Sequence, residues 1–173
     1  TATQPALNYR DDFKIGLEGV RPIIPDASGL HERLRRTKVN FRGVIPTDEL
    51  GCELSESDQV LCIVNTRAEA AALYELLGES EGNFHLSTRM CGEHRSRKID
   101  EIRERLALGD RCRVVSTQLI EAGVDVDFPT VYRAICGLDS LAQAAGRCNR
   151  EGRRDFGNVY LFETEKTPPA GFL

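Results

Sequence analysis

The chain has 173 residues, of which 40% are hydrophobic and 29% are charged, a balance typical of one globular domain with modest extensions. No run approaches the roughly 20 apolar residues that a membrane span needs, so we expect a soluble protein without a membrane partner. The net charge of −4 argues against nucleic-acid binding through overall basicity, but arginines gather locally at 33–42 and 89–113. Most of these arginines have the pattern of solvated helix faces.

The termini and the cysteines favour a reduced compartment. The sequence begins at Thr1 with no initiator Met and no signal-peptide pattern, so we interpret it as a piece of a longer protein. Its six cysteines form no CxxC pair, which favours a cytoplasmic location. Cys91 and His94 are the nearest approach to a zinc half-site, but no second pair follows at a suitable spacing, so we predict no metal site.

The elements before residue 59 are predicted from short patterns. Residues 20–24 and 38–44 are rich in strand-forming side chains, and a helix is expected to begin near Asp26, whose carboxylate can cap it. The segment 48–58 is acidic and is expected to form a surface loop. At the other end of the chain, residues 166–173 contain two prolines and a glycine and are expected to form a linker.

From residue 59 onward, strand-like runs alternate with helical ones. Strands are predicted at 60–64, 83–87, 112–116, 131–136 and 158–162, and helices at 67–77, 93–108 and 140–149. Nearly continuous apolar strands separated by helices indicate an α/β fold of three layers, with a mostly parallel central sheet and helices on both faces. Ligand sites in such folds lie at the carboxyl ends of the strands.

Polar side chains follow three of the predicted strands. They are Asn65 and Thr66 after the first, Thr88 and Arg89 after the second, and Thr117 after the third. Each alone is equally typical of a turn or a helix cap. Together they suit a groove that follows a sugar-phosphate backbone without reading its bases.

One amide and two guanidinium groups recur at helical spacing near the end of the chain. On a helix over 140–149 continued by one turn, Gln143, Arg147 and Arg150 occupy positions i, i+4 and i+7 and share a face. Gly146 would lie inside this helix at a cost of about 1 kcal/mol, which suggests that something approaches the backbone closely. Paired guanidiniums suit a polyphosphate, but periodicity alone favours an ordinary salt-bridged helix.

The segment 117–125 follows a buried strand and carries groups suited to a nucleotide. Gly123 would let the backbone come close to a ligand, and Asp125 could accept hydrogen bonds from ribose hydroxyls. Taken alone, the segment is at least as typical of a capping turn.

In chain order these segments resemble the motifs of superfamily 2 helicases, most strongly those of the CRISPR-associated helicase-nuclease of type I systems. Residues 1–7 resemble motif III, 61–67 motif IV, 86–89 the following accessory motif, 114–128 motif V and 139–150 motif VI. The pattern Gln-x-x-Gly-Arg-x-x-Arg begins about 18 residues after Gly-Val-Asp, a placement that makes a chance match improbable.

The resemblance implies a RecA-like fold and a role for each motif. Residues 1–15 would be the end of a first motor domain with its linker, 16–165 the second motor domain, and 166–173 a linker onward. Arg147 and Arg150 would be arginine fingers reaching the γ-phosphate of ATP, and Gln143 would order the attacking water. Gly123 and Asp125 would contact the nucleotide. The DNA phosphates would be held by Asn65, Thr66, Thr88, Arg89 and Thr117.

The resemblance also implies cofactors and partners beyond this chain. The whole protein would translocate 3′ to 5′ on single-stranded DNA in CRISPR interference, an antiviral defence, after recruitment by an RNA-guided surveillance complex. ATP and Mg²⁺ would be bound mainly by the first RecA-like domain, and a transition metal only by a nuclease domain. This sequence contains no Gly-Lys-Thr phosphate loop, no Asp-Glu-x-His motif and no His-Asp pair. We therefore expect no ATP hydrolysis and no DNA cleavage from the chain alone.

Two other interpretations remain open on the sequence. The chain could belong to another superfamily 2 motor, such as an RNA helicase or a DNA-repair helicase. It could also be a non-catalytic nucleic-acid-binding module that kept the motor fold, although intact Gln143, Arg147 and Arg150 argue against such decay.

Overall fold

The computed structural model describes residues 7–21, 23–24, 26–121 and 123–165, and the chain divides between Arg35 and Arg36 into two compact units. The segment expected to be motif III lies outside the described residues except for Leu7, and the expected linker at 166–173 lies outside them entirely. The domain boundary expected at residues 15 and 16 stays a prediction.

The first unit contains the helix α1 (Ala27–Arg33), which begins where the sequence indicated. The Asp26 carboxylate accepts a hydrogen bond from the Gly29 amide at 2.8 Å and thereby caps the helix. The strand expected at 20–24 is wrong, because the described residues of that stretch form no strand and expose Val20, Ile23 and Ile24. β-branched side chains favour a strand chiefly where they pack against a neighbouring strand and a buried face.

The second unit is built on one six-stranded sheet with the order β1-β6-β5-β2-β4-β3, and every neighbouring pair is parallel. The strands are β1 (Thr37–Val44), β2 (Gln59–Ile63), β3 (Asn83–Leu86), β4 (Cys112–Ser116), β5 (Thr130–Ala134) and β6 (Gly157–Glu163). The parallel sheet predicted from the apolar runs is thus confirmed, with bounds that differ by one or two residues.

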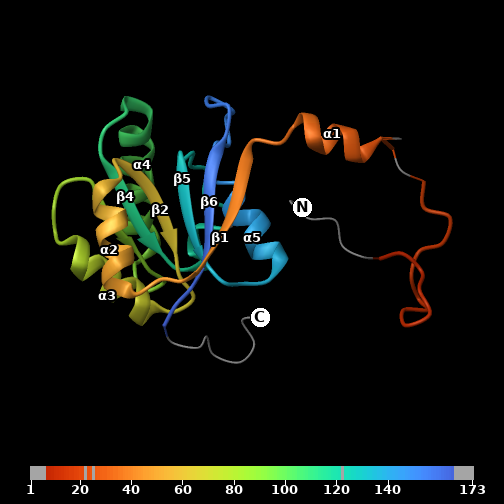
Figure 1. Cartoon of the computed structure of the whole chain (residues 1–173), viewed down its shortest axis with the longest axis horizontal. Coiled ribbons are helices and arrows are strands. Elements are labelled where there is room, and N and C mark those ends of the chain that lie inside the picture. The colour runs from red at the N-terminus through yellow and green to blue at the C-terminus, as the bar shows by residue number, and fades with distance from the viewer. Residues whose placement is uncertain (1–6, 22, 25, 122, 166–173) are drawn as a thin grey trace. The chain divides into compact units, whose positions relative to one another are not determined.

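Helices cover both faces of this sheet and complete the predicted three layers. α2 (Thr47–Glu56) and α3 (Arg67–Leu77) pack on one face, and α4 (Gly92–Leu108) and α5 (Leu138–Ala145) on the other. Figure 1 shows α2 and α3 together on one side of the strands and α5 on the opposite side. A hydrophobic core lies on each face of the sheet, and successive side chains of β2 alternate between the two cores. Val60 and Cys62 face α2 and α3, while Leu61 and Ile63 face α4 and α5.

The acidic segment at 48–58 is a helix and not the expected surface loop. Leu50 and Leu54 stand one turn apart and are almost fully buried against the sheet, while Asp48, Glu49 and Glu56 of the same helix are exposed. Arg113, the last arginine of the basic stretch at 89–113, lies buried in β4 and donates to the carbonyl of Ser57 at 2.7 Å and to that of Ser55. Its guanidinium thus fixes the end of α2 to the amino end of β4.

The connection from β4 to β5 crosses the carboxyl end of β2, because β2 lies between these two strands in the sheet. A parallel sheet opens a crevice where its strand order reverses in this way, and ligands bind there. This connection is the segment that the sequence analysis assigned to nucleotide contact. Within the described part of the chain, no helix is long and apolar enough to cross a membrane.

Candidate functional site

The connection from β4 to β5 presents its polar residues by burying the apolar residues between them. Val124, Val126 and Phe128 point into the core, so the alternating positions Gly123 and Asp125 are exposed. Gly123 has a φ of +72°, a left-handed conformation that side chains other than glycine's rarely adopt. Local chain geometry therefore places the two predicted nucleotide contacts on the solvent side of the loop.

The helix that carries Gln143 is shorter than the sequence indicated. α5 ends at Ala145, and Gly146 is its C-cap and not an interior residue. Gly146 is exposed, and the nearest atoms to a Cβ at this position would be carbonyls of α5 itself, so no other segment makes the close approach inferred from the sequence. The shared helical face proposed for Gln143, Arg147 and Arg150 is therefore wrong, since both arginines lie beyond the helix.

A backbone pairing, and not helical periodicity, brings the two arginines to the β4–β5 connection. The amide of Phe128 donates to the carbonyl of Arg147, and the amide of Asn149 donates to the carbonyl of Phe128, both at 2.9 Å. Asn149 is the one non-glycine residue with positive φ among the described residues, at 45°, a conformation that Asn tolerates. Its buried amide group donates to the carbonyls of Arg36 and Arg154, at 3.1 and 2.7 Å.

Arg147 is buried against this connection, with 9% of its surface exposed. Its Nε donates to the carbonyl of Ile120 at 3.1 Å and its Nη2 to the carbonyl of Glu121. Burial lowers the pKa of its guanidinium, which nevertheless stays charged at any physiological pH. The Nη1 group donates no hydrogen bond to the part of the chain that the structure describes, so the side chain is anchored on one side and free on the other.

Arg150 is held more loosely than Arg147. Its Nε lies 2.6 Å from the Asp125 carboxylate, and the two side chains are 44% and 69% exposed. The backbone amide of Arg150 donates to Asp127 Oδ1 at 2.7 Å, so the position of the residue is fixed while its side chain remains accessible. The structure thus brings together Gly123, Asp125, Arg147 and Arg150. Gln143 is half-buried on α5, and its side chain makes no hydrogen bond within the described residues.

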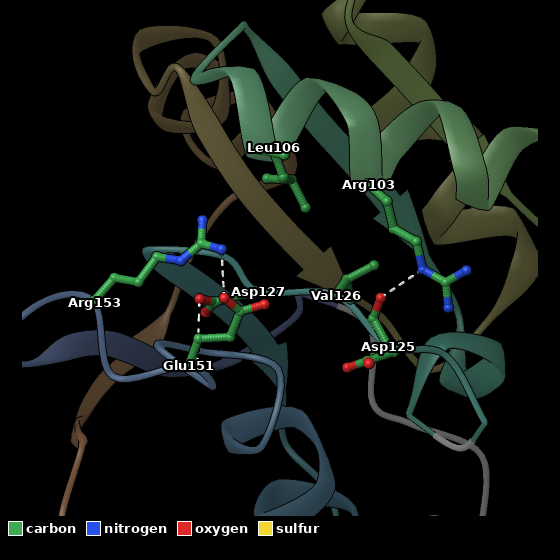
Figure 2. Close-up of a pocket in the computed structure, with 8 residues that line it drawn as sticks. Arg103, Leu106, Asp125, Val126, Asp127, Glu151 and Arg153 are labelled. Atoms are coloured by element: carbon green, nitrogen blue, oxygen red, sulfur yellow. Dashed lines mark hydrogen bonds and ion pairs between the residues drawn. The ribbon is translucent and has the colours of Figure 1, made fainter.

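A shallow hollow of about 220 Å³ lies behind Asp125 and is smaller than the usual pocket for a small ligand. Figure 2 shows Arg103 reaching the backbone carbonyl of Asp125, at 2.8 Å, and Arg153 paired with Glu151 on the opposite wall. The guanidiniums of Arg103 and Arg153 that line this hollow are balanced by the carboxylates of Asp125, Asp127 and Glu151. These charges compensate one another, so the hollow supports the loop and offers no separate anion site.

The five residues predicted to contact nucleic acid differ in how free their side chains are. The Asn65 amide is buried and donates to the carbonyl of Ile135 at 2.8 Å, and Thr66 caps α3 in a reciprocal pair with Glu69. Thr117 begins a short 3₁₀ turn (Gln118–Ile120) and its hydroxyl has no hydrogen bond within the described residues. Thr88 and Arg89 lie exposed in the turn after β3.

Sequence reasoning missed a buried ionic network beside these residues. Arg133 on β5 and Glu121 in the β4–β5 connection form an ion pair of 2.8 Å, and both side chains are almost fully buried. Ser140 on α5 donates to the same carboxylate at 3.0 Å. An arginine in an otherwise apolar strand, at 131–134, is the only signal in the sequence that pointed to this network.

A family model described as "CRISPR-associated nuclease/helicase Cas3, C-terminal" matches residues 56–153, which is more than half of the chain. The match covers β2 to α5, the β4–β5 connection and both arginines. The chain belongs to this family. The family resemblance inferred from the sequence is therefore confirmed.

One curated relative in the Cas3 family comes from Methanothermobacter thermautotrophicus and is called "CRISPR-associated nuclease/helicase Cas3". It is 33% identical over 122 residues, which are 67% of this chain but 15% of the relative. The chain therefore spans only a small part of the length of this Cas3 relative.

Solved structures of Cas3 share the fold of this chain. A crystal structure of T. fusca Cas3 with ADP has a TM-score of 0.61 at 22% identity, covering 77% of this chain and 19% of its own. A chain in the structure titled "CRISPR RNA-guided surveillance complex, pre-nicking" has a TM-score of 0.56 at 22% identity, covering 76% of this chain and 19% of its own. These likenesses confirm the RecA-like architecture of the Cas3 helicase domains.

Proposed function

We propose that this chain is the second motor domain of an ATP-dependent translocase that moves 3′ to 5′ on single-stranded DNA in CRISPR interference. In this proposal it completes an ATP site whose phosphate loop and Mg²⁺ ligands belong to a first RecA-like domain. The observation that carries the proposal is the convergence of Gly123, Asp125, Arg147 and Arg150 at the carboxyl edge of the sheet, within the Cas3 family match.

The residues at this edge suit the groups of a bound nucleotide. Gly123 leaves open space in front of its backbone, and the exposed Asp125 carboxylate can accept hydrogen bonds from ribose hydroxyls. Two adjacent guanidiniums match the charge of a triphosphate. ATP supplies the phosphoryl group when bound, and this chain contributes positive charge where negative charge develops in the transition state.

The two arginines are suited to different parts of this task. Arg150 is the mobile finger, because its side chain is exposed and can exchange the Asp125 carboxylate for a phosphate. Arg147 is the fixed finger, because two carbonyls hold its Nε and Nη2 while Nη1 remains available. Gln143, on the preceding helix, would order the attacking water. An arginine finger contributes roughly 10³ to 10⁵ in rate in related phosphoryl transferases.

DNA contact is proposed along the same edge, at the turns that follow β2, β3 and β4. Thr88 and Arg89 are exposed and free to bind phosphate oxygens, whereas Thr117 is buried and offers only a hydroxyl that has no partner among the described residues. Asn65 and Thr66 already have internal partners, so their contribution would come through backbone position or through shared hydrogen bonds. This set contacts phosphate and not bases, as a motor that moves along any sequence requires.

The remaining expectations concern the whole protein. We propose that it acts in the cytoplasm, that an RNA-guided surveillance complex recruits it, and that a nuclease domain with transition-metal ions cuts the strand it moves. The present chain holds the second motor domain of that assembly and is inactive alone.

The test is single-turnover ATP hydrolysis, with saturating single-stranded DNA, by the polypeptide that joins this chain to its first motor domain. Arg150→Ala should lower the hydrolysis rate by at least about 10³-fold. Arg153→Ala is the matched control, because Arg153 lies three residues after Arg150, is also exposed and pairs with Glu151. Near-normal turnover in Arg150→Ala, or an equal loss in Arg153→Ala, would defeat the finger assignment.

A further inference from the structure

A buried guanidinium links three segments of the chain at the carboxyl edge of the sheet. Arg133 on β5 has 1% of its side chain exposed, and its Nε lies 2.8 Å from Glu121 Oε1. Its Nη1 donates to Asn65 Oδ1 at 2.7 Å and to the carbonyl of Ala134 at 2.9 Å. Arg133 therefore ties the end of β5 to the turn after β2 and to the β4–β5 connection.

Glu121 extends this network to the finger residues. Its second carboxylate oxygen accepts the hydroxyl of Ser140 at 3.0 Å, on the helix that also carries Gln143. Its backbone carbonyl accepts Nη2 of Arg147. A single residue thus joins Arg133, the start of α5 and one of the proposed fingers.

Stability alone does not account for this pair. Burying both charges carries a large desolvation penalty, and replacing such a pair with apolar side chains of similar volume is often neutral or stabilising. An apolar pair would fill the same space but would not fix the direction of the Glu121 carbonyl. The feature that the ion pair adds is the placement of that carbonyl, and with it the placement of the Arg147 side chain.

We propose that Arg133 and Glu121 are positioning residues for the ATP site. They hold the Arg147 side chain in its observed position and connect it through Asn65 to the residues proposed to contact DNA. The inference rests on the proposed function. Neither residue touches the nucleotide, and both act through the Glu121 carbonyl and the Asn65 amide. Losing the pair lowers turnover at saturating ATP and DNA more than it weakens ATP binding, because the finger acts in the transition state.

The experiment compares two buried arginines in the polypeptide that joins this chain to its first motor domain. The variant Arg133→Met with Glu121→Leu replaces the pair with apolar side chains. Arg113→Met is the control, because Arg113 is also buried and bonded to backbone carbonyls but lies at the opposite, amino end of β4. DNA-stimulated kcat and the KM for ATP are measured for each, with thermal unfolding to monitor folding.

We expect kcat to fall about tenfold or more in the double variant while KM changes by less than about threefold, and to stay near the parent value in Arg113→Met. Arg133→Lys, which keeps a charge but loses the fork between Glu121 and Asn65, should give an intermediate kcat. Equal losses of kcat in the double variant and in Arg113→Met would overturn the positioning role, as would an unchanged kcat.

Amide hydrogen exchange of the chain separates this proposal from the proposed function. The amides of Phe128 and Asn149 hold the arginine segment against the β4–β5 connection, so both should exchange faster in the double variant than in Arg113→Met. If the parent shows no DNA-stimulated hydrolysis, the proposed function fails, and the exchange decides the positioning role. Unchanged exchange at both amides would then overturn it.

Discussion

The two arginines of the candidate site should contribute very differently to folding. Arg147 makes two charge-assisted hydrogen bonds to carbonyls of the β4–β5 connection, and such bonds are worth about 1.5–3 kcal/mol each. Because the freed carbonyls can regain water, we expect Arg147→Ala to lower the free energy of unfolding by about 2–4 kcal/mol. Arg150 forms an exposed ion pair and one long, exposed hydrogen bond from Nη1 to the carbonyl of Gly146, at 3.5 Å, so Arg150→Ala should cost at most about 1 kcal/mol.

This asymmetry is measurable on the chain itself by thermal and urea unfolding followed by circular dichroism. For a domain of this size, 1 kcal/mol shifts the unfolding midpoint by about 2–4 °C, so Arg147→Ala should lower it by roughly 5–15 °C and Arg150→Ala by no more than about 4 °C. The urea m-value should be unchanged in both variants. Equal midpoint shifts would show that the Arg147 anchor does not exist, and the distinction between a fixed and a mobile finger would be wrong.

Three further predictions test the fold around the site. Gly157→Ala should destabilise the chain by about 1–3 kcal/mol, because its Cβ would lie 2.5 Å from the Cys148 sulfur, whereas Gly92→Ala, with open space around it, should have no such effect in the same urea titration. Burial lowers the pKa of His85, so the folded chain resists protonation, and stability present above about pH 6.5 is lost as the pH falls toward the folded pKa. His85→Phe should flatten that part of the stability-pH curve, and an unaltered curve would contradict the assignment. Alkylation at pH 8 should label the exposed thiols of Cys52 and Cys91 first, because burial raises the pKa of Cys112 and of Cys148 to about 12; early labelling of either buried thiol, read by mass spectrometry, would contradict the packing.

The elements that could be predicted from the sequence are those whose determinants are local. α3 has the predicted bounds because Thr66 and Glu69 cap its start and Gly78 ends it. The central strands β2, β4 and β5 were predictable because each is a largely apolar run that is buried on both faces. α2 was missed because its charged residues outnumber the two leucines, Leu50 and Leu54, that bury it.

The parts that could not be predicted depend on contacts between distant segments. α5 ends early because Gly146 caps it and Phe128 pairs with Arg147 and Asn149, and this pairing between distant segments is not visible in the local sequence. Arg133 and Glu121 meet only because the β4–β5 connection crosses the end of β2. The motifs pointed to two arginines that the structure does bring to the β4–β5 connection, but helical spacing gave the wrong reason for their position.

The central claim is that this chain supplies the arginines of an ATP site whose phosphate loop and Mg²⁺ ligands belong to a first RecA-like domain. It is tested most directly by measuring ATP turnover of the chain alone and of the chain joined to its first motor domain, each with and without single-stranded DNA. We expect no turnover by the chain alone and DNA-stimulated turnover by the joined polypeptide. ATP hydrolysis by the isolated chain, or a joined polypeptide that DNA does not stimulate, would contradict it.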